Sequence, residues 1–247
     1  MVYFKDKIFR NKLKGYWSII PSLQIHEIMG IAGFNFGIID LEHGTYSFQE
    51  ALESVIAIKK SGMSALIRPS SHDEKEILRC LELGVDGICI PHIKNIKEAK
   101  SVLSFAKYPP KGIRGASGFT RATRYGADKF DEHVVKSNKS IFISLLIESM
   151  EGLSNAKEIA ELDGVDNLYF GTYDIASSIG DKNQKGEKIQ KIIKETIDKI
   201  GDSVSYGQVC VDNIQYNRID PRINMIVHGV DCGIILNGAI NARKGFI

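Results

Sequence analysis

Short apolar runs alternate along the chain with longer segments in which apolar residues recur every three or four positions. The short runs suit strands buried on both faces of a parallel sheet, and the longer segments suit amphipathic helices. The pattern predicts strands at 15–20, 36–40, 64–68, 87–91, 143–148, 167–171, 205–211 and 232–238. It predicts helices at 4–14, 23–33, 47–62, 72–84, 95–107, 128–137, 154–162, 187–201 and 214–229, with a short one from Asp174. Pro221 should bend or interrupt the helix at 214–229.

Eight strand-helix alternations without a linker or an internal repeat predict an α/β fold, a TIM (β/α)8 barrel that forms one domain over residues 1–247. An open doubly wound sheet is the competing architecture, but no predicted strand is followed by the GxGxxG pattern of dinucleotide-binding sheets. Few residues follow the eighth predicted strand, so the final helix is expected to be truncated.

Composition agrees with an ordinary soluble globular protein. Apolar residues make up 43% and charged residues 25% of the chain, which is enough for a large core and gives no sign of disorder. The formal net charge of +2 is too small to indicate nucleic acid binding. No apolar run approaches the ~20 residues of a membrane span, and the N-terminal segment lacks the apolar centre of a signal peptide. We expect a cytoplasmic protein that binds neither nucleic acid nor membrane.

The four cysteines stand singly in predicted helices and strands, at Cys80, Cys89, Cys210 and Cys232. Zinc and redox sites use closely spaced cysteine pairs, which are lacking in this sequence. We therefore predict buried thiols outside any disulfide.

A long segment at 108–130, rich in glycine, proline and basic residues, interrupts the regular alternation. Loops of this length in compact domains are usually functional or mobile. Arg121 and Arg124 could attract an anionic substrate from this loop, although exposed loop arginines more often bind nothing specific.

Polar residues that end the predicted strands are the candidates for chemistry, because TIM-barrel active sites lie at the carboxyl ends of the strands. These residues are Trp17, Asp40, Glu42, His43, Arg68, His92, Glu148 and Asp174. Two carboxylates can hold a hard divalent cation and leave positions for water and substrate. An arginine supplies fixed charge against an enolate or a carboxylate, and a histidine can move a proton at neutral pH.

Each candidate also has a purely structural interpretation. Asp174 could cap its helix, and Glu148 could be a buried acid neutralised by Arg68. His43 could lie on the surface ahead of a helix, and Trp17 could belong to the core. His92, a single histidine after Pro91, is left outside the catalytic set.

Several stretches together resemble the HpcH/HpaI family of metal-dependent 2-keto-acid aldolases. The resemblance begins with DLEHGTYSFQE at 40–50, whose Asp-x-Glu-His pattern is the family's signature after strand two. It continues through 65–99, YPPKGIRG at 108–115, IES at 147–149 and DGVDNLYFGTYDIASSIG at 163–180. The first unit, with Trp17, is also similar, so the match runs over roughly residues 15–180.

The resemblance implies a role for each site residue. Glu148 and Asp174 would bind Mg²⁺, Mn²⁺ or Co²⁺, His43 would be the acid-base residue, and Arg68 would stabilise the enolate oxygen of pyruvate. Trp17 would line the pocket, and the backbone amides of Gly171, Thr172 and Tyr173 would bind the carboxylate of the 2-keto acid. The implied reaction cleaves or forms a 4-hydroxy-2-keto acid, with pyruvate and an aldehyde as products, in a homo-oligomer that is a trimer or hexamer.

The chain departs from the family pattern beside both acids. Leu146 stands where the family commonly has glutamine, and Tyr173 is bulkier than the usual residue. Two other functions stay open: a lyase of the phosphoenolpyruvate or pyruvate type on the same barrel, and a non-catalytic relative that binds a keto acid. A Schiff-base aldolase is disfavoured, because no lysine ends a predicted inner strand.

Overall fold

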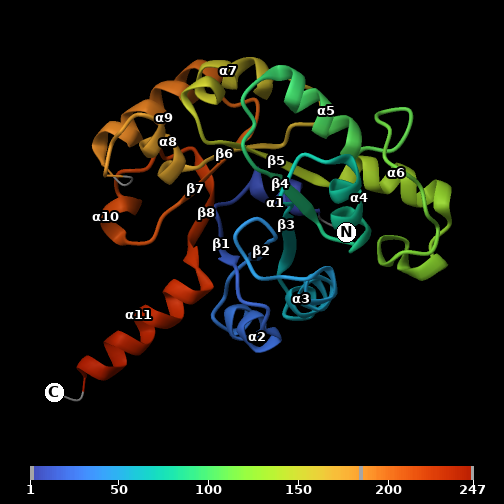
Figure 1. Ribbon diagram of the computed structural model, residues 1–247, viewed down its shortest axis with the longest axis horizontal. Coiled ribbons are helices and arrows are strands. Elements are labelled where there is room, and N and C mark those ends of the chain that lie inside the picture. Colours follow the sequence, from blue (N-terminus) through green and yellow to red (C-terminus); the bar gives the residue numbers. More distant parts are fainter. Residues whose placement is uncertain (1–2, 184–185, 246–247) are drawn as a thin grey trace.

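The computed structural model describes residues 3–183 and 186–245. Within these residues, eight parallel strands close into a barrel in chain order, because β1 pairs with both β2 and β8 (Figure 1). The strands are β1 (Leu13–Ser18), β2 (Phe36–Asp40), β3 (Ser64–Arg68), β4 (Gly87–Ile90), β5 (Phe142–Ile147), β6 (Asn167–Phe170), β7 (Ser205–Val209) and β8 (Ile223–Val230). The predicted TIM barrel is confirmed.

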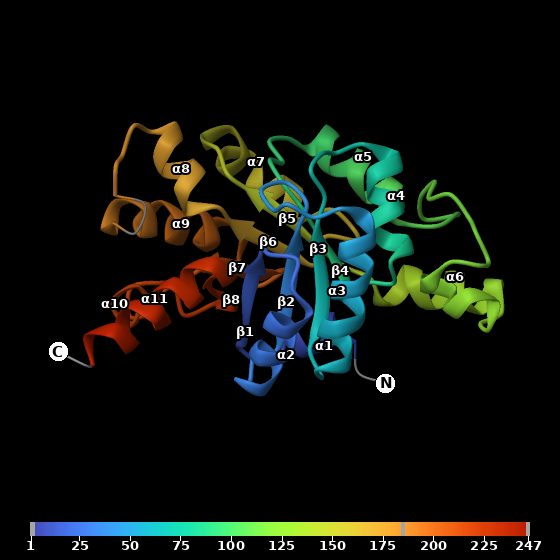
Figure 2. The same cartoon turned by 60° about the horizontal axis from the view of Figure 1, so that its bottom comes forward.

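Helices connect the strands and surround the barrel (Figures 1 and 2). They are α1 (Phe4–Ile8), α2 (Leu23–Ile31), α3 (Phe48–Lys60), α4 (Glu74–Glu82), α5 (Ile96–Ala106), the 3-10 helix η1 (Arg121–Gly126), α6 (Phe130–Ser140), α7 (Met150–Ala160), α8 (Thr172–Ser178), α9 (Glu187–Ile200), α10 (Asn213–Tyr216) and α11 (Asp231–Lys244). Capping side chains fix the first turn of several helices. At α3, the side chains of Ser47 and Glu50 each accept a hydrogen bond from the backbone N–H of the other residue. Across the described ranges, every helix is too short or too polar to cross a membrane.

Alternate residues of each strand point into the barrel. On β2, Phe36 and Ile38 are fully buried in the interior, and Asp40 follows them on the same side at the carboxyl end of the strand. At the other end of the barrel, Phe4 of α1 packs edge-on against Phe36 and Phe142, with ring centroids 5.4 and 4.9 Å apart. α1 thus closes the amino-terminal end with apolar rings, and the charged residues Asp40 and Arg68 lie at the carboxyl end.

The last strand and the last helix differ from the prediction. β8 lies inside the segment 214–229 that was expected to be helical, and the expected eighth strand at 232–238 belongs to α11. The prediction of a truncated final helix is therefore wrong: α11 runs for 14 residues and extends away from the barrel (Figure 1). Pro221 precedes β8 and bends no helix. Short apolar runs do not distinguish a buried strand from a helix, and the exposed apolar residues of α11 imitate a strand.

Two smaller expectations also change. The first helix ends at Ile8 and β1 begins at Leu13, so the predicted helix at 4–14 is too long. The four cysteines form no disulfide among the described residues, and three of them are buried as predicted. Cys232 is exposed, because it lies on α11 and not in a strand.

Candidate active site

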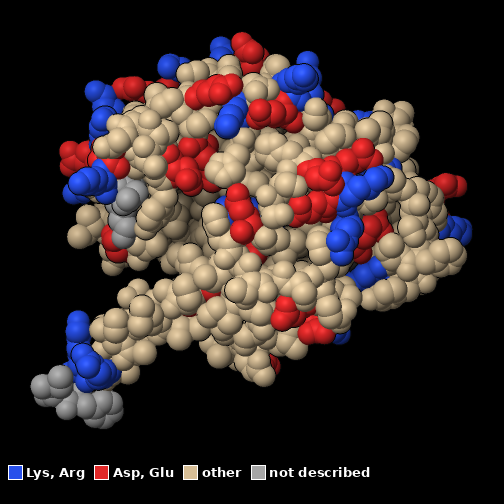
Figure 3. All heavy atoms as spheres, in the orientation of Figure 1, with Lys and Arg blue, Asp and Glu red and all other residues tan. Residues whose placement is uncertain are grey.

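The predicted site residues gather at the carboxyl ends of the strands. Asp40 and Arg68 end β2 and β3, and Glu148 directly follows β5. Trp17 lies near the end of β1, and Asp174 lies in the first turn of α8, after β6. Figure 3 views this face of the barrel, where acidic side chains border a hollow near the centre of the ring. The sequence thus brings residues from five of the first six strand-helix units, all but the fourth, to one mouth.

Arg68 is the centre of a buried ionic network. Its Nε donates to Asp40 Oδ1 over 2.8 Å, and its Nη2 donates to Asp40 Oδ2 over 2.5 Å. Nη1 lies 2.9 Å from Glu42 Oε2. Burial disfavours the charged guanidinium, but the hydrogen bonds and the charge of Asp40 outweigh it, so the pKa of Arg68 is raised. The ionic partners of Arg68 are Asp40 and Glu42, and not Glu148 as the structural interpretation supposed.

Trp17 packs against this charge. The guanidinium carbon of Arg68 lies 4.4 Å from the centroid of the indole ring, within range of a cation-π interaction. The indole Nε1 donates to the hydroxyl of Tyr169 over 3.3 Å. Trp17 is buried, and these two contacts hold its ring flat against the side chain of Arg68, so it is more than a core residue.

His43 stands apart from the other predicted residues. Asp40 Oδ1 accepts hydrogen bonds from the amides of Glu42 and His43, over 3.0 and 3.3 Å, and these bonds fix the turn after β2. The imidazole itself is 69% exposed, and its Nε2 lies 4.0 Å from Glu42 Oε2. The structure places His43 at the rim of the mouth, without direct contact to Arg68 or Glu148 among the described residues.

Glu148 is buried at the mouth, with its two oxygens in different surroundings. Oε2 accepts a hydrogen bond from the backbone N–H of His92 over 2.9 Å and lies 3.0 Å from His92 Nδ1. Oε1 lies on the side of Gly171, where an added Cβ would be only 2.7 Å away. Burial raises the pKa of Glu148; the contacts of His92 oppose this rise, and the nearby charge of Asp174 adds to it.

Glu148 and Asp174 are the two carboxylates at this mouth that could hold a divalent cation. Within residues 3–183 and 186–245, no group of three or more His, Cys, Asp or Glu side chains forms a complete metal site. Glu148 and Asp174 nevertheless supply hard carboxylate oxygens, and their like charges act on one another. A cation bound between them would relieve this repulsion and would take its remaining ligands from water and substrate.

Of the predicted carboxylate-binding amides after β6, the N–H of Gly171 already donates to Ile147 O over 3.1 Å, which leaves the amides of Thr172 and Tyr173 as candidates. Gly171 precedes α8, and Thr172 is buried at the first helical position. The Oγ1 atom of Thr172 is buried and has no hydrogen-bond partner among the described residues. Tyr173 is 55% exposed, so its ring does not fill the mouth of the barrel. The other departure from the family pattern, Leu146, is buried in the apolar interior of the barrel.

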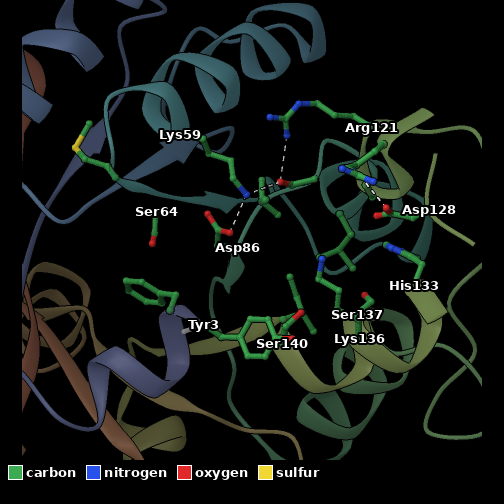
Figure 4. A pocket seen from close by; sticks show the side chains of 18 of the residues that line it. Tyr3, Lys59, Ser64, Asp86, Arg121, Asp128, His133, Lys136, Ser137 and Ser140 are labelled. Atoms are coloured by element: carbon green, nitrogen blue, oxygen red, sulfur yellow. Dashed lines mark hydrogen bonds and ion pairs between the residues drawn. The ribbon is translucent and has the colours of Figure 1, made fainter. Parts of the chain in front are cut away.

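A cavity of about 590 Å³ lies at the opposite end of the barrel, beside the first residues of β3 (Figure 4). Its charged groups bind one another: Lys59 Nζ lies 2.8 Å from Asp86 Oδ1, and Arg124 Nε lies 2.7 Å from Asp128 Oδ1. Arg121 Nη1 donates to a backbone carbonyl at the end of α4 over 2.7 Å. Both loop arginines are therefore remote from the predicted site, and attraction of substrate to them is not supported.

Sequence reasoning missed the part that His92 takes in the site. Its Nε2 lies 3.2 Å from Glu42 Oε1, while its Nδ1 faces Glu148. The available signal is its position directly after Pro91, just beyond β4, where a TIM barrel places functional side chains. Glu42 can be recognised as a candidate from the sequence, but its position between Arg68 and His92 is known only from the folded structure.

Comparisons with known proteins give consistent results. A sequence model of the HpcH/HpaI aldolase/citrate lyase family matches residues 15–206. The chain is 33% identical over 200 residues to a pyruvate aldolase of Rhizobium etli, covering 81% of this chain and 77% of that protein. It is 32% identical over 205 residues to a 5-keto-4-deoxy-D-glucarate aldolase of Enterobacter sp., covering 78% and 79%. An HpcH/HpaI aldolase/citrate lyase family protein of Burkholderia cenocepacia superimposes with a TM-score of 0.90 over 98% of both chains, at 21% identity.

Proposed function

The chain belongs to the HpcH/HpaI aldolase/citrate lyase family, and from this premise we propose that it is a divalent-metal-dependent class II aldolase. Its reaction cleaves a 4-hydroxy-2-keto acid to pyruvate and an aldehyde, or forms it from them. The observation that carries the proposal is that two buried side chains lie at the same mouth of the barrel: Arg68, which is ion-paired with Asp40, and Glu148.

Glu148 and Asp174 are the proposed ligands of Mg²⁺, Mn²⁺ or Co²⁺. When bound, the cation polarises the 2-keto group and holds the negative charge that develops on the enolate. Both ligands follow neighbouring strands, β5 and β6, whose register aligns Ile147 with Phe170. This pairing supports a site shared by the two carboxylates.

Arg68 is the proposed electrostatic partner of the enolate oxygen. Asp40 binds one edge of its guanidinium with two hydrogen bonds, and the indole of Trp17 covers one face, so the charge is already oriented before substrate arrives. Such pre-oriented charge in a water-poor site stabilises developing negative charge more effectively than a mobile side chain does. Trp17 would line the pocket and keep water from the reacting atoms.

The substrate carboxylate is assigned to the backbone amides of Thr172 and Tyr173, since the N–H of Gly171 already donates to Ile147 O over 3.1 Å. The buried Oγ1 of Thr172, which has no partner in the described part of the chain, offers one more hydrogen-bond donor in this segment. His43 is the proposed acid-base residue. Its exposed imidazole at the rim suits proton exchange with solvent and with the aldehyde portion of the substrate.

A homo-oligomer, trimer or hexamer, belongs to the same proposal. α11 extends from the barrel and exposes apolar side chains along its length: Ile235 is 47% exposed, Leu236 60% and Ile240 38%. A helix with exposed apolar residues on this scale is favoured to pack against another subunit.

The test is pyruvate release, coupled to lactate dehydrogenase, from a panel of 4-hydroxy-2-keto acids. We expect activity with Mn²⁺ and a loss of at least 100-fold after treatment with EDTA, restored when Mn²⁺ is added back. Equal rates with and without the cation would exclude the metal mechanism. Binding of Mn²⁺ and pyruvate without any turnover would instead identify a non-catalytic keto-acid-binding relative.

A further inference from the structure

His92 has an unusual backbone conformation for its residue type. Its φ is +51°, in the left-handed region that a side chain with a Cβ rarely adopts. This conformation aims both the backbone N–H and the imidazole at the mouth of the barrel, where they meet Glu148 Oε2 at 2.9 and 3.0 Å. Strained conformations of this kind persist where the surrounding contacts require them, and they cluster at functional sites.

The imidazole completes a chain of polar contacts across the mouth. Asp40 binds Arg68, and Arg68 binds Glu42. Glu42 Oε1 lies 3.2 Å from His92 Nε2, and His92 Nδ1 lies 3.0 Å from Glu148. These residues come from the ends of four consecutive strands, β2 to β5. His92 is the link between the group proposed to face the enolate and a carboxylate proposed to bind the cation.

The contacts of His92 also decide which oxygen of Glu148 is available. Oε2 accepts the hydrogen bond from the backbone N–H of His92 and lies 3.0 Å from its Nδ1, whereas Oε1 lies against Gly171, the residue that precedes α8. The carboxylate therefore turns Oε1 toward the first turn of α8, which carries Asp174. Without the imidazole, the carboxylate could rotate about its last bond and would lose this orientation.

We propose that His92 is a positioning residue, which holds Glu148 with Oε1 turned toward Asp174 and so prepares the site to bind a divalent cation. This inference rests on the proposed function. It assigns His92 no contact with the cation. Partners that orient metal ligands in this way typically contribute 10- to 100-fold to metal affinity.

The test compares Mn²⁺ binding, measured by titration calorimetry and by electron paramagnetic resonance, in the full-length protein and three variants. His92→Gly tolerates the positive φ and keeps the backbone N–H but removes the imidazole. His92→Asn also tolerates this conformation and keeps one side-chain donor. Arg124→Gly is the matched control, because Arg124 has the same φ of +51° in η1, at the opposite end of the barrel.

We expect His92→Gly to bind Mn²⁺ 10- to 100-fold more weakly, with His92→Asn between it and the wild type. Its thermal midpoint should not fall, since glycine removes backbone strain, and Arg124→Gly should share this stability without losing affinity. A merely structural role for His92 would not separate affinity from stability in this way. An affinity of His92→Gly within twofold of the wild type overturns the inference. So does a nitrogen hyperfine coupling to bound Mn²⁺ that disappears in the variant, which would make His92 a ligand.

The wild-type measurement separates the two levels of the argument. If the unchanged protein fails to bind Mn²⁺, the proposed function fails, and the role of His92 fails with it. If the wild type binds Mn²⁺ and releases pyruvate while His92→Gly does the same with equal affinity, the proposed function stands and only the role of His92 is refuted.

Discussion

Gly171 should be intolerant of even one added methyl group, because Glu148 lies against its Cα. A Cβ at this position would be 2.5 Å from Glu148 Cγ, 2.7 Å from Oε1 and 3.1 Å from Cδ. The backbone at Gly171 has φ −80° and ψ 89°, so alanine introduces no left-handed strain there. The effect of Gly171→Ala therefore comes from contact with Glu148 and not from the conformation of residue 171.

The size of the displacement follows from these distances. Carbon atoms pack favourably at about 3.5–4.0 Å, so the Glu148 side chain must move by about 1 Å. It cannot retreat freely, because His92 holds its Oε2 and the side chain is buried. A misplacement of about 1 Å at a reacting centre lowers rates by on the order of 100-fold, or about 2.7 kcal/mol in the barrier. Overpacking should also reduce stability by about 1–3 kcal/mol.

The assay is kcat/KM for pyruvate release in the presence of Mn²⁺, with circular dichroism to confirm folding. Gly118→Ala is the matched control, because nothing lies within 4 Å of a Cβ built at Gly118. We expect the control to behave like the wild type. If folded Gly171→Ala retains kcat/KM within twofold, the tight contact with Glu148 has no bearing on catalysis, and the assignment of this carboxylate is refuted.

Three other substitutions test separate parts of the structure. Arg68→Lys removes the two-point contact with Asp40, so kcat/KM should fall by about 10-fold or more; an unchanged value would exclude Arg68 as the electrostatic partner. Burial lowers the pKa of Lys107 from 10.5 to about 8, so the folded protein releases this proton at a lower pH than the unfolded chain does. The free energy of unfolding should therefore rise as pH increases from about 8 to 10.5. This change in pKa corresponds to about 3.4 kcal/mol, and methionine also loses the hydrogen bond from Lys107 Nζ to Asn138 O, about 1 kcal/mol. Lys107→Met should therefore stabilise the protein by about 2 kcal/mol at pH 7 in urea unfolding, with a gain that shrinks toward pH 10; a gain independent of pH would contradict this. Leu236→Lys on α11 should shift the molar mass measured by light scattering toward the monomer, and an unchanged mass would argue against assembly through this helix.

The placement of the charged site residues could be predicted because it follows from local rules. A strand buried on both faces reads as a continuous apolar run, and a polar residue that ends such a run lies at the carboxyl mouth of the barrel. Arg68 and Glu148 obey this rule, and both are buried at that mouth. Their pairing could not be predicted by the same rule. The guanidinium binds Asp40 on the neighbouring strand, a choice that depends on the registry of β2 and β3.

The errors come from features that a local pattern does not contain. α11 carries apolar residues that contact little of this chain, so its pattern resembles that of a buried strand. The eighth strand was therefore predicted within α11, and the segment that forms β8 was predicted to be helical. His92 has only one signal in the sequence, its position directly after the predicted fourth strand. Its importance arises from a positive φ and from contacts with carboxylates distant in the sequence, as with Glu148, 56 residues further on.

The balance of charge at the mouth supports the proposed cation site. Asp40, Glu42, Glu148 and Asp174 bring four carboxylates to this end of the barrel, and Arg68 is already committed to the first two of them. A 2-keto acid is itself an anion and would be repelled by such a surface. Glu148 and Asp174 are the acids that Arg68 does not bind directly, so a divalent cation placed at this pair offsets the excess negative charge where the substrate must enter. Leu146, which is buried, and Tyr173, which is exposed, depart from the family pattern but carry no charge. On this reasoning they do not change the arrangement of charges on which the proposed chemistry depends.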